Sequence, residues 1–215
     1  MLENVPLFAP LSPQDRTKLE VGMVTLNFAK GSVLVSQGET PNNLLYLTLS
    51  GKLKVVMANE EGREILLAVL QEGDSFGELS LFDEEPRSAT VIAVEDCKVA
   101  LLPRAYFFDC LRNNPDIAIE LLKTVIKRMR NTTEQVSSLA LLDVYGRLAK
   151  TLSDMAEIQP DGSMMTGHLT HQELSTRVGA SREMVTRILN DLKRGGYIAV
   201  TKHRIELKKT LPMRW

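Results

Sequence analysis

The stretch THQELSTRVGASREMVTRILNDLKRGG, residues 170–196, contains two helix-start signals separated by a glycine turn. Its first four residues, Thr170 to Glu173, have the form of a capping box, in which the two side chains bond each other's backbone N–H groups. This pattern predicts a helix that begins at Thr170 and runs to about Arg177. Gly179 then supplies the turn, and Ser181 is placed to cap a second helix.

The second helix is predicted from Arg182 to about Arg194, where a glycine pair stops it. Two short apolar runs follow at 197–200 and 204–207, with a Thr-Lys-His turn between them, and they predict a β-hairpin. Two short helices joined at a glycine turn and followed by a hairpin form a winged helix-turn-helix.

The second helix has one polar face. At about 100° per residue, Arg182, Glu183, Thr186, Arg187 and Asn190 fall within roughly 140° of one another. Arginine can pair with guanine and glutamate can accept from cytosine N4 in the major groove, although a solvated surface helix can carry the same residues. The hairpin turn adds phosphate-binding candidates, Lys202, His203 and Arg204. The candidate DNA contacts are Thr170, Ser181, Arg182, Glu183, Thr186, Arg187, Lys202 and His203.

Charge divides unevenly along the chain. Residues 1–142 hold 14 Lys and Arg against 19 Asp and Glu, whereas residues 143–215 hold 12 against 8. The net charges are therefore −5 and +4. A basic C-terminal part has the sign expected of a domain that faces DNA.

The first half of the chain reads as strand-length apolar runs separated by glycines at intervals of about ten residues. The predicted strands are Val33–Val35, Leu44–Leu49, Leu53–Met57, Ile65–Leu70, Ala89–Val94 and Lys98–Leu102. This pattern indicates an antiparallel barrel or roll. We assign residues 1–113 to a jelly-roll-like β-roll.

A long helix is predicted after Pro115, because residues 116–142 contain neither Gly nor Pro. Apolar or small residues recur there at alternating steps of four and three, namely Ala118, Leu122, Val125, Met129, Thr132, Val136 and Leu139. A heptad seam of this length predicts pairing with a second copy of the helix, and the alternative is a single helix packed on its own domain. We assign 114–142 to a dimerisation helix with its hinge, and 143–215 to the DNA-binding domain. Residues 143–157 continue in helical style up to a turn at 159–163.

The stretch Gly73–Thr90 combines a glycine, an acid and an arginine in a pattern that suits an anion. Gly77 would let the backbone approach a ligand, and a short helix beginning there would present N–H groups. Arg87 could hold a phosphate as a charged fork, and Glu78 could accept from a ribose hydroxyl.

Two segments resemble a known family. Phe76-Gly-Glu-Leu79 with Pro86–Thr90 resembles the phosphate-binding cassette of cyclic-nucleotide-binding domains, and Ala180–Leu189 is similar to the recognition helix of the cAMP receptor protein family, in the Crp/Fnr superfamily of bacterial transcription regulators. Leu139–Leu148 resembles the hinge of that family. The resemblance implies an α+β fold and a cytoplasmic homodimer that binds cAMP, double-stranded DNA at pseudo-palindromic TGTGA-like half-sites, and RNA polymerase.

The resemblance also implies an effector site. Glu78 would hold the ribose 2′-hydroxyl, and Arg87 with Ser88 would hold the cyclic phosphate. Gly77 and Leu79 would supply backbone contacts.

On the long helix, Thr132 and Thr133 would meet the adenine, one from each subunit. Thr133 stands where a member of that family has serine, so the hydroxyl is kept and a methyl group is added. A ligand that touches both residues would be bound by the dimer.

The identity of the effector stays open at this point. Cyclic di-GMP is an alternative, as is a vestigial pocket with no ligand. Iron–sulfur sensors of the family use an N-terminal cysteine cluster, but no cysteine precedes Cys97; haem sensors use a histidine in the sensor domain, but all three histidines lie within 143–215. We therefore expect no metal, haem or iron–sulfur cluster, and we expect Cys97 and Cys110 to be reduced thiols in or near a core.

Other functional classes are less consistent with the sequence. No nucleophile, base and orienting residue fall together in a motif, so no enzyme activity is expected. A cyclic-nucleotide module that acts through protein contacts is the alternative from another class, and the winged helix-turn-helix argues against it.

Acidic residues on a predicted hairpin, Glu60, Glu61 and Glu64, resemble a polymerase-contacting patch or form a plain surface turn. Neither a signal peptide nor an apolar run of roughly 20 residues is found, which predicts a cytoplasmic protein without membrane contact.

Overall fold

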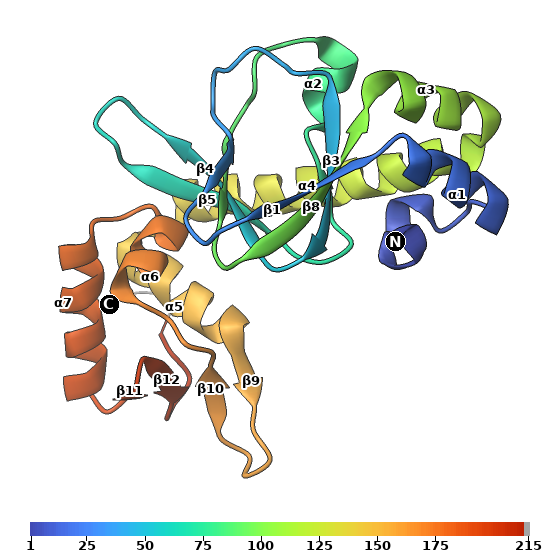
Figure 1. Cartoon of the computed structure of the whole chain (residues 1–215). Coiled ribbons are helices and arrows are strands. Elements are labelled where there is room, and N and C mark those ends of the chain that lie inside the picture. Colours follow the sequence, from blue (N-terminus) through green and yellow to red (C-terminus); the bar gives the residue numbers. More distant parts are fainter. Residues whose placement is uncertain (213–215) are drawn as a thin grey trace. The chain divides into compact units, whose positions relative to one another are not determined.

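The computed structural model describes residues 1–212 of the chain (Figure 1). The chain divides into two compact units. The first comprises Met1–Met57 and Leu67–Arg130, and the second comprises Ala58–Leu66 and Asn131–Trp215. The domain boundaries predicted from the sequence, which treat the long helix as a segment of its own, stay predictions.

The first unit contains a β-roll made from two four-stranded sheets, except that Ala58 of β4 and residues 64–66 of β5 are counted in the second unit. One sheet has the order β1-β8-β3-β6 and the other the order β2-β7-β4-β5. Strands β1 and β3 both pair antiparallel with β8, and β7 pairs antiparallel with both β2 and β4. The strands are β1 (Val24–Phe28), β2 (Val33–Val35), β3 (Leu44–Ser50), β4 (Leu53–Ala58), β5 (Glu64–Leu70), β6 (Ser75–Phe76), β7 (Thr90–Ala93) and β8 (Cys97–Pro103).

Strand β3 is buried on both faces, which accounts for its continuous apolar sequence. Leu45 and Leu47 pack into one hydrophobic cluster with Phe8 and Phe107. Tyr46, on the opposite face, packs into a second cluster with Phe76. The strand is therefore the shared wall of two cores.

Helices cover one of these cores. They are the 3₁₀ turns η1 (Leu2–Asn4) and η2 (Pro6–Phe8), and the helices α1 (Pro13–Val21), α2 (Glu78–Asp83), α3 (Arg104–Asn113) and the first part of α4 (Pro115–Leu141). Helix α1 begins where the Ser12 hydroxyl accepts from the Asp15 backbone N–H at 3.2 Å. Helix α4 buries Ile117 and Leu121 in the same core.

The second unit is a winged helix-turn-helix with a four-stranded sheet of order β11-β12-β10-β9. After α5 (Val144–Met155) come β9 (Ala156–Ile158), β10 (Met164–Thr166), α6 (His171–Val178), α7 (Arg182–Arg194), β11 (Ile198–Thr201) and β12 (Arg204–Leu207). Leu148, Leu174 and Leu189 lie in the core that joins the three helices. The predicted fold class, an α+β chain with a roll, a long helix and a winged helix-turn-helix, is confirmed.

One prediction from the sequence was wrong. Helical structure does not reach residue 157, because α5 ends at Met155 and residues 156–158 form β9. The turn at 159–163 therefore joins β9 to β10, closed by a hydrogen bond from the Gln159 N–H to the Ser163 carbonyl at 2.8 Å. Pairing with β10 outweighs the local helical preference here.

The expected state of the cysteines is confirmed: Cys97 and Cys110 are both buried and unpaired. None of the helices in residues 1–212 combines the length and apolar character needed to cross a membrane. The same residues hold no group of three or more His, Cys, Asp or Glu side chains arranged to bind a metal ion.

Candidate effector site and DNA-reading face

The predicted phosphate-binding cassette begins at Gly77, between β6 and α2. Gly77 has φ +85°, a left-handed conformation that glycine adopts without strain. A Cβ atom placed there would lie 2.8 Å from Arg87 Nη1 and 3.2 Å from the Leu44 carbonyl oxygen. Only glycine therefore fits both the backbone turn and the arginine that packs on it.

Arg87 is buried, with 5% of its surface exposed. Its Nη1 donates to the Gly77 carbonyl at 3.0 Å, and its Nη2 donates to Asn42 Oδ1 at 2.6 Å and to the Leu44 carbonyl at 3.5 Å. Its guanidinium carbon lies 5.6 Å from the centre of the Tyr46 ring. No carboxylate within residues 1–212 forms an ion pair with it, so the site keeps a net positive charge suited to an anion.

Glu78, the first residue of α2, is also 5% exposed. Its Oε1 accepts from Arg128 Nη1 on α4 at 2.6 Å, and Arg128 Nη2 donates to the Ser75 carbonyl. Its Oε2 is buried and has no hydrogen-bond partner in the described part of the chain. A buried carboxylate oxygen in this condition is an acceptor suited to a ligand hydroxyl.

The other two cassette residues lie at the surface. Leu79 is about half exposed, and Ser88 is exposed next to the buried Arg87. The structure thus brings Gly77, Glu78 and Arg87 together.

Sequence reasoning missed Asn42 and Arg128, which hold Arg87 and Glu78. Asn42 is 45 residues from Arg87 and Arg128 is 50 residues from Glu78. Neither belongs to the cassette motif, so no local signal marks them.

Thr132 and Thr133 lie on α4 in the second unit, and both are exposed. Thr132 comes one helical turn after Arg128. Their contact with an effector stays a prediction.

Helix α4 carries an apolar stripe that the chain itself leaves open. Four of the seven predicted seam positions are exposed large hydrophobics, with Leu122 59% and Met129 62% accessible, together with Val136 and Leu139. Ile119 and Ile126, one position further round the helix, are also about half exposed. This stripe is distinct from the face that buries Ile117 and Leu121 in the roll.

The predicted start signals of the two DNA-domain helices are confirmed. Thr170 and Glu173 form a complete capping box at α6, and the Ser181 hydroxyl accepts from the Met184 N–H at 3.2 Å at α7. Gly179 ends α6 in a left-handed conformation with φ +63°. The turn between the helices therefore forms for the local reasons that the sequence indicates.

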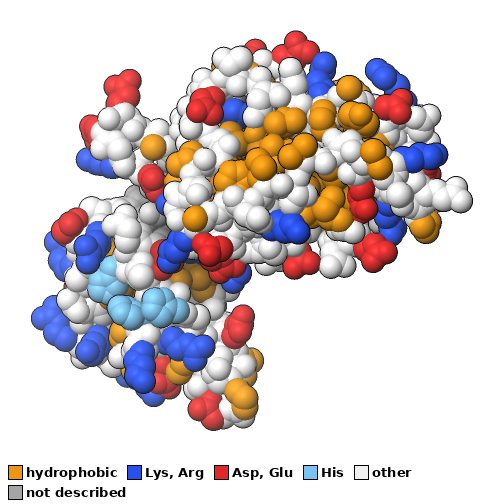
Figure 2. Space-filling view, viewed as in Figure 1, with side chains coloured by type: hydrophobic (Ala, Val, Ile, Leu, Met, Phe, Trp, Pro, Cys, Tyr) orange, Lys and Arg blue, Asp and Glu red, His pale blue; other side chains and the backbone are white. Residues whose placement is uncertain are grey.

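Helix α7 presents the predicted polar face. Arg182, Glu183, Arg187 and Asn190 are exposed, while Val185, Ile188, Leu189 and Leu192 are buried. Figure 2 shows Lys, Arg and His side chains gathered over the part of the surface that carries α7 and the β11–β12 hairpin. The face can offer both donors and an acceptor to base edges.

Two residues of this face have partners within the domain. Thr186 Oγ1 lies 2.8 Å from His171 Nδ1 on α6, which ties the two helices together. The pKa of Glu183 is lowered, first by its own backbone N–H and then by the Ser181 hydroxyl, with the Arg182 charge adding to both. Glu183 is therefore an ionised acceptor at neutral pH.

The wing turns through two residues with left-handed backbones, Lys202 at φ 47° and His203 at φ 66°. This conformation suits a two-residue hairpin turn. Both side chains are exposed, and the ring of His203 lies 4.8 Å from that of His168. The predicted phosphate-binding candidates thus stand at the tip of the hairpin.

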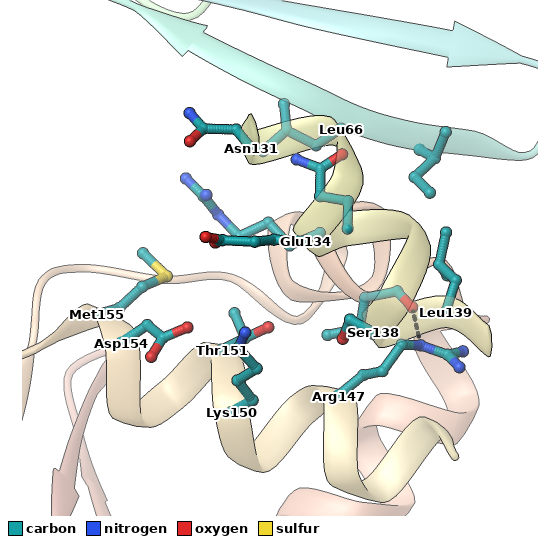
Figure 3. A pocket seen from close by; sticks show the side chains of 14 residues that line it. Leu66, Asn131, Glu134, Ser138, Leu139, Arg147, Lys150, Thr151, Asp154 and Met155 are labelled. Carbon is teal, nitrogen blue, oxygen red and sulfur yellow. Dashed lines mark hydrogen bonds between the residues drawn. The ribbon is translucent and has the colours of Figure 1, made fainter. Parts of the chain in front are cut away.

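A separate cavity of about 310 Å³ lies within the second unit (Figure 3). Glu134 and Ser138 of α4 line one side of it, and Lys150 and Thr151 of α5 line the other. Arg147, which also lines the cavity, donates from Nε to the Val178 carbonyl at 2.8 Å and from Nη1 to the Leu142 carbonyl at 2.9 Å. None of the predicted effector or DNA contacts lines this cavity.

Two family models match the chain. The model of the cyclic nucleotide-binding domain matches residues 25–114, and the Crp-like helix-turn-helix domain matches residues 146–210. A CRP-like cAMP-activated global transcriptional regulator of Mycobacterium tuberculosis is 32% identical over 215 residues, covering 98% of this chain and 93% of the relative. The chain belongs to the Crp/Fnr family of transcription regulators.

Other relatives agree with this family assignment. The cAMP-activated global transcriptional regulator CRP of Pasteurella multocida is 40% identical over 168 residues, covering 75% of this chain and 79% of the relative. The solved structure of CLP, a c-di-GMP responsive global regulator from Xanthomonas campestris, has a TM-score of 0.81 and 23% identity, covering 93% of this chain and all of that chain. The latter likeness shows the fold alone. As a Crp/Fnr member, the chain is a cyclic-nucleotide-responsive regulator with a DNA-binding helix-turn-helix, and its relatives are regulators of transcription, not enzymes.

Proposed function

We propose that cAMP is the effector of this regulator, and that it binds in the cassette of the first unit. The observation that carries this proposal is the pair of buried groups at Gly77: the Arg87 guanidinium without a carboxylate partner, and Glu78 Oε2 without a donor, both judged within residues 1–212. A cyclic phosphate supplies the anion and a ribose 2′-hydroxyl supplies the donor. Relatives described as cAMP-activated support the choice.

Each cassette residue has a role in this proposal. Glu78 accepts from the 2′-hydroxyl, and Arg87 with Ser88 binds the cyclic phosphate. The backbone of Gly77 and Leu79 completes the contact, because the glycine allows the chain to approach the ligand closely. Arg128 positions Glu78 through their ion pair.

The regulator acts as a homodimer in this proposal. The exposed stripe of α4 follows the spacing of a two-stranded coiled coil, so a second copy would cover it. Thr132 and Thr133 would then meet the adenine from the two subunits, which makes the effector part of the dimer interface.

DNA reading is assigned to α7. Arg182, Glu183 and Arg187 read base edges in the major groove, with Thr186 beside them. Lys202 and His203 bind phosphates through the wing.

Thr170 and Ser181 are proposed as further DNA contacts. They lie at the N-terminal ends of α6 and α7, where backbone N–H groups favour a phosphate. Two such domains related by a two-fold axis require a pseudo-palindromic site with TGTGA-like half-sites about one helical turn apart.

The effector acts by shifting a pre-existing equilibrium between two orientations of the DNA-binding domains. The hinge is proposed near Leu142–Tyr145, which spans the two-residue gap after α4 and the first two residues of α5. The difference in effector affinity between the two states supplies the free energy.

The chain would act in the cytoplasm, where its DNA partner lies, and would contact RNA polymerase, with Glu60, Glu61 and Glu64 as candidate contact residues.

The test is fluorescence anisotropy of a labelled TGTGA-type palindrome with the full chain, titrated with cAMP, cGMP and cyclic di-GMP in parallel. We expect cAMP to raise DNA affinity, Arg87→Ala to abolish the response, and the matched variant Arg63→Ala, on the exposed β4–β5 hairpin, to keep it. Tighter DNA binding with cyclic di-GMP alone would overturn cAMP as the effector. DNA binding that ignores all three nucleotides would overturn the proposed role of the cassette.

A further inference from the structure

Asn42 bridges the cassette arginine and the β3 tyrosine. Its Oδ1 accepts from Arg87 Nη2 at 2.6 Å, and its Nδ2 donates to the Tyr46 hydroxyl at 2.6 Å. Because a guanidinium has only donors, the amide oxygen must face Arg87, which fixes the orientation of the amide. Tyr46 is itself held by stacking on Phe76, with 4.8 Å between the ring centres.

Asn42 is exposed at the surface, yet its side chain contacts a buried arginine. The residue lies at the surface just before β3, whereas Arg87 is almost fully buried. The remaining hydrogen-bond acceptors of the Arg87 guanidinium are backbone carbonyls of Gly77 and Leu44. Every group that holds this cation in the described chain is therefore neutral.

A neutral acceptor has a physical consequence that a carboxylate would not have. An aspartate at position 42 could accept the same hydrogen bond, and the Tyr46 hydroxyl could turn to donate to it. An opposite charge within about 4–6 Å stabilises the charged form of its partner by roughly one to three pKa units, and it would compete with an incoming anion to the same extent. Neutral partners leave the cation available.

We propose that Asn42 is a positioning residue that holds Arg87 in place without neutralising it, and thereby tunes the affinity of the cassette for the cyclic phosphate. This inference rests on the proposed function, because it takes the phosphate of the effector to bind at Arg87. It adds a determinant of affinity that lies outside the cassette sequence.

The experiment uses isothermal titration of cAMP and cyclic di-GMP into the full-length protein, with thermal unfolding of each ligand-free variant. Asn42→Asp is expected to weaken binding of the nucleotide that the wild type binds by about ten- to a hundredfold. The same variant should not lower the unfolding temperature of the ligand-free protein, since it adds an ion pair to Arg87. A purely structural role for Asn42 would move affinity and stability in the same direction.

Two further variants separate charge from geometry. Asn42→Ala removes the acceptor without adding a charge, so it should lose less affinity than Asn42→Asp. Asn43→Asp makes the same chemical change one residue along, at a position with φ 55° that aspartate tolerates, and should bind within about twofold of the wild type.

The outcomes distinguish the two proposals. Wild-type protein that binds neither nucleotide would overturn the proposed function, and the role of Asn42 with it. Wild-type binding with Asn42→Asp unchanged, or with Asn42→Ala losing as much affinity as Asn42→Asp, would overturn the role of Asn42 alone. If Asn42→Asp does not fold, Asn42→Ala still tests the positioning role, and unchanged affinity in that variant would also overturn it.

Discussion

Gly77 is held in a left-handed conformation with the Arg87 guanidinium packed directly on it. Gly62 has a similar φ, +75°, but a Cβ atom there would meet nothing within 4 Å. Alanine at either position adds about 1–3 kcal/mol of backbone strain, but only at Gly77 does the side chain also displace the arginine.

This contrast predicts different effects of Gly77→Ala and Gly62→Ala. Backbone strain should lower the free energy of unfolding by a similar amount in both variants. Gly77→Ala should lose a further amount, because its Cβ also displaces Arg87. Only Gly77→Ala should weaken cyclic-nucleotide binding, by about tenfold or more, which corresponds to 1.4 kcal/mol or more of lost interaction. Urea denaturation and isothermal titration measure the two quantities, and equal ligand affinity in the two variants would contradict the geometry at Gly77.

Cys110 should make the free energy of unfolding depend on pH. Burial raises the pKa of its thiol to about 11, with the negative charges of Asp15 and Asp109 acting in the same direction. The unfolded thiol loses its proton near 9.0, so between about pH 9 and 11 the folded state alone keeps the proton. The free energy of unfolding should therefore fall as pH rises through this window.

The measurement is urea denaturation at several pH values from 8 to 11. Burial also raises the pKa of Cys97 and of Tyr145, so these groups contribute to the decline. Cys110→Ala isolates the thiol: its stability should fall less steeply over the same range than that of the wild type. Identical slopes in the two proteins would show that Cys110 has no part in the effect.

At the scale of elements, the sequence predicts those that form for local reasons. Six strands of the roll, β2 to β5, β7 and β8, match the predicted apolar runs closely, whereas β1 and β6 were not predicted. Helices α6 and α7 begin at the predicted caps. Helix α1 escaped prediction because Leu19 is its one buried residue, which leaves no periodic apolar pattern. Strand β9 escaped because its three residues are held by pairing with β10, a contact that local propensity does not encode.

The residues of the candidate site also fall into two groups, those that the sequence predicts and those that only the fold brings together. Gly77, Glu78 and Arg87 lie within one motif, so their types and spacing are visible in the sequence. Asn42 and Arg128 reach the site from other elements through pairings that exist only in the folded roll. The motif therefore identifies the groups that would touch the ligand, but not the groups that hold them.

The exposed apolar stripe of α4 allows dimerisation to be tested by mutation. In a two-fold coiled coil, Leu122 at a seam position meets its own copy, so Leu122→Glu would place two carboxylates in an apolar interface. Each buried, unpaired charge costs about 3–5 kcal/mol, which should shift the protein to monomers. Lys127→Glu places the same side chain on the opposite side of the helix and should leave the dimer intact. Sedimentation equilibrium measures both, and a stable Leu122→Glu dimer would rule out this seam.

On the scale of the whole molecule, the acidic and basic residues are distributed unevenly along the chain. Residues 1–142 carry −5 and residues 143–215 carry +4. The basic part supplies phosphate contacts whose strength depends on salt, while base contacts decide sequence preference. These two contributions to DNA binding should therefore respond to different mutations.

Lys202→Ala should weaken binding to all DNA sequences alike and reduce the slope of log affinity against log salt by about 2 for a dimer, since each phosphate contact contributes about 0.9. Glu183→Ala should leave that slope unchanged and relax the preference at one base pair of each half-site by about 1–3 kcal/mol. Lys18→Ala, which removes a cation from α1 of the roll, should change neither quantity. The measurement is anisotropy at four salt concentrations with the palindrome and single-base variants of it. If Glu183→Ala changed the salt slope and left base preference intact, α7 would be a phosphate-binding helix, and the reading face would have to lie elsewhere in the winged domain.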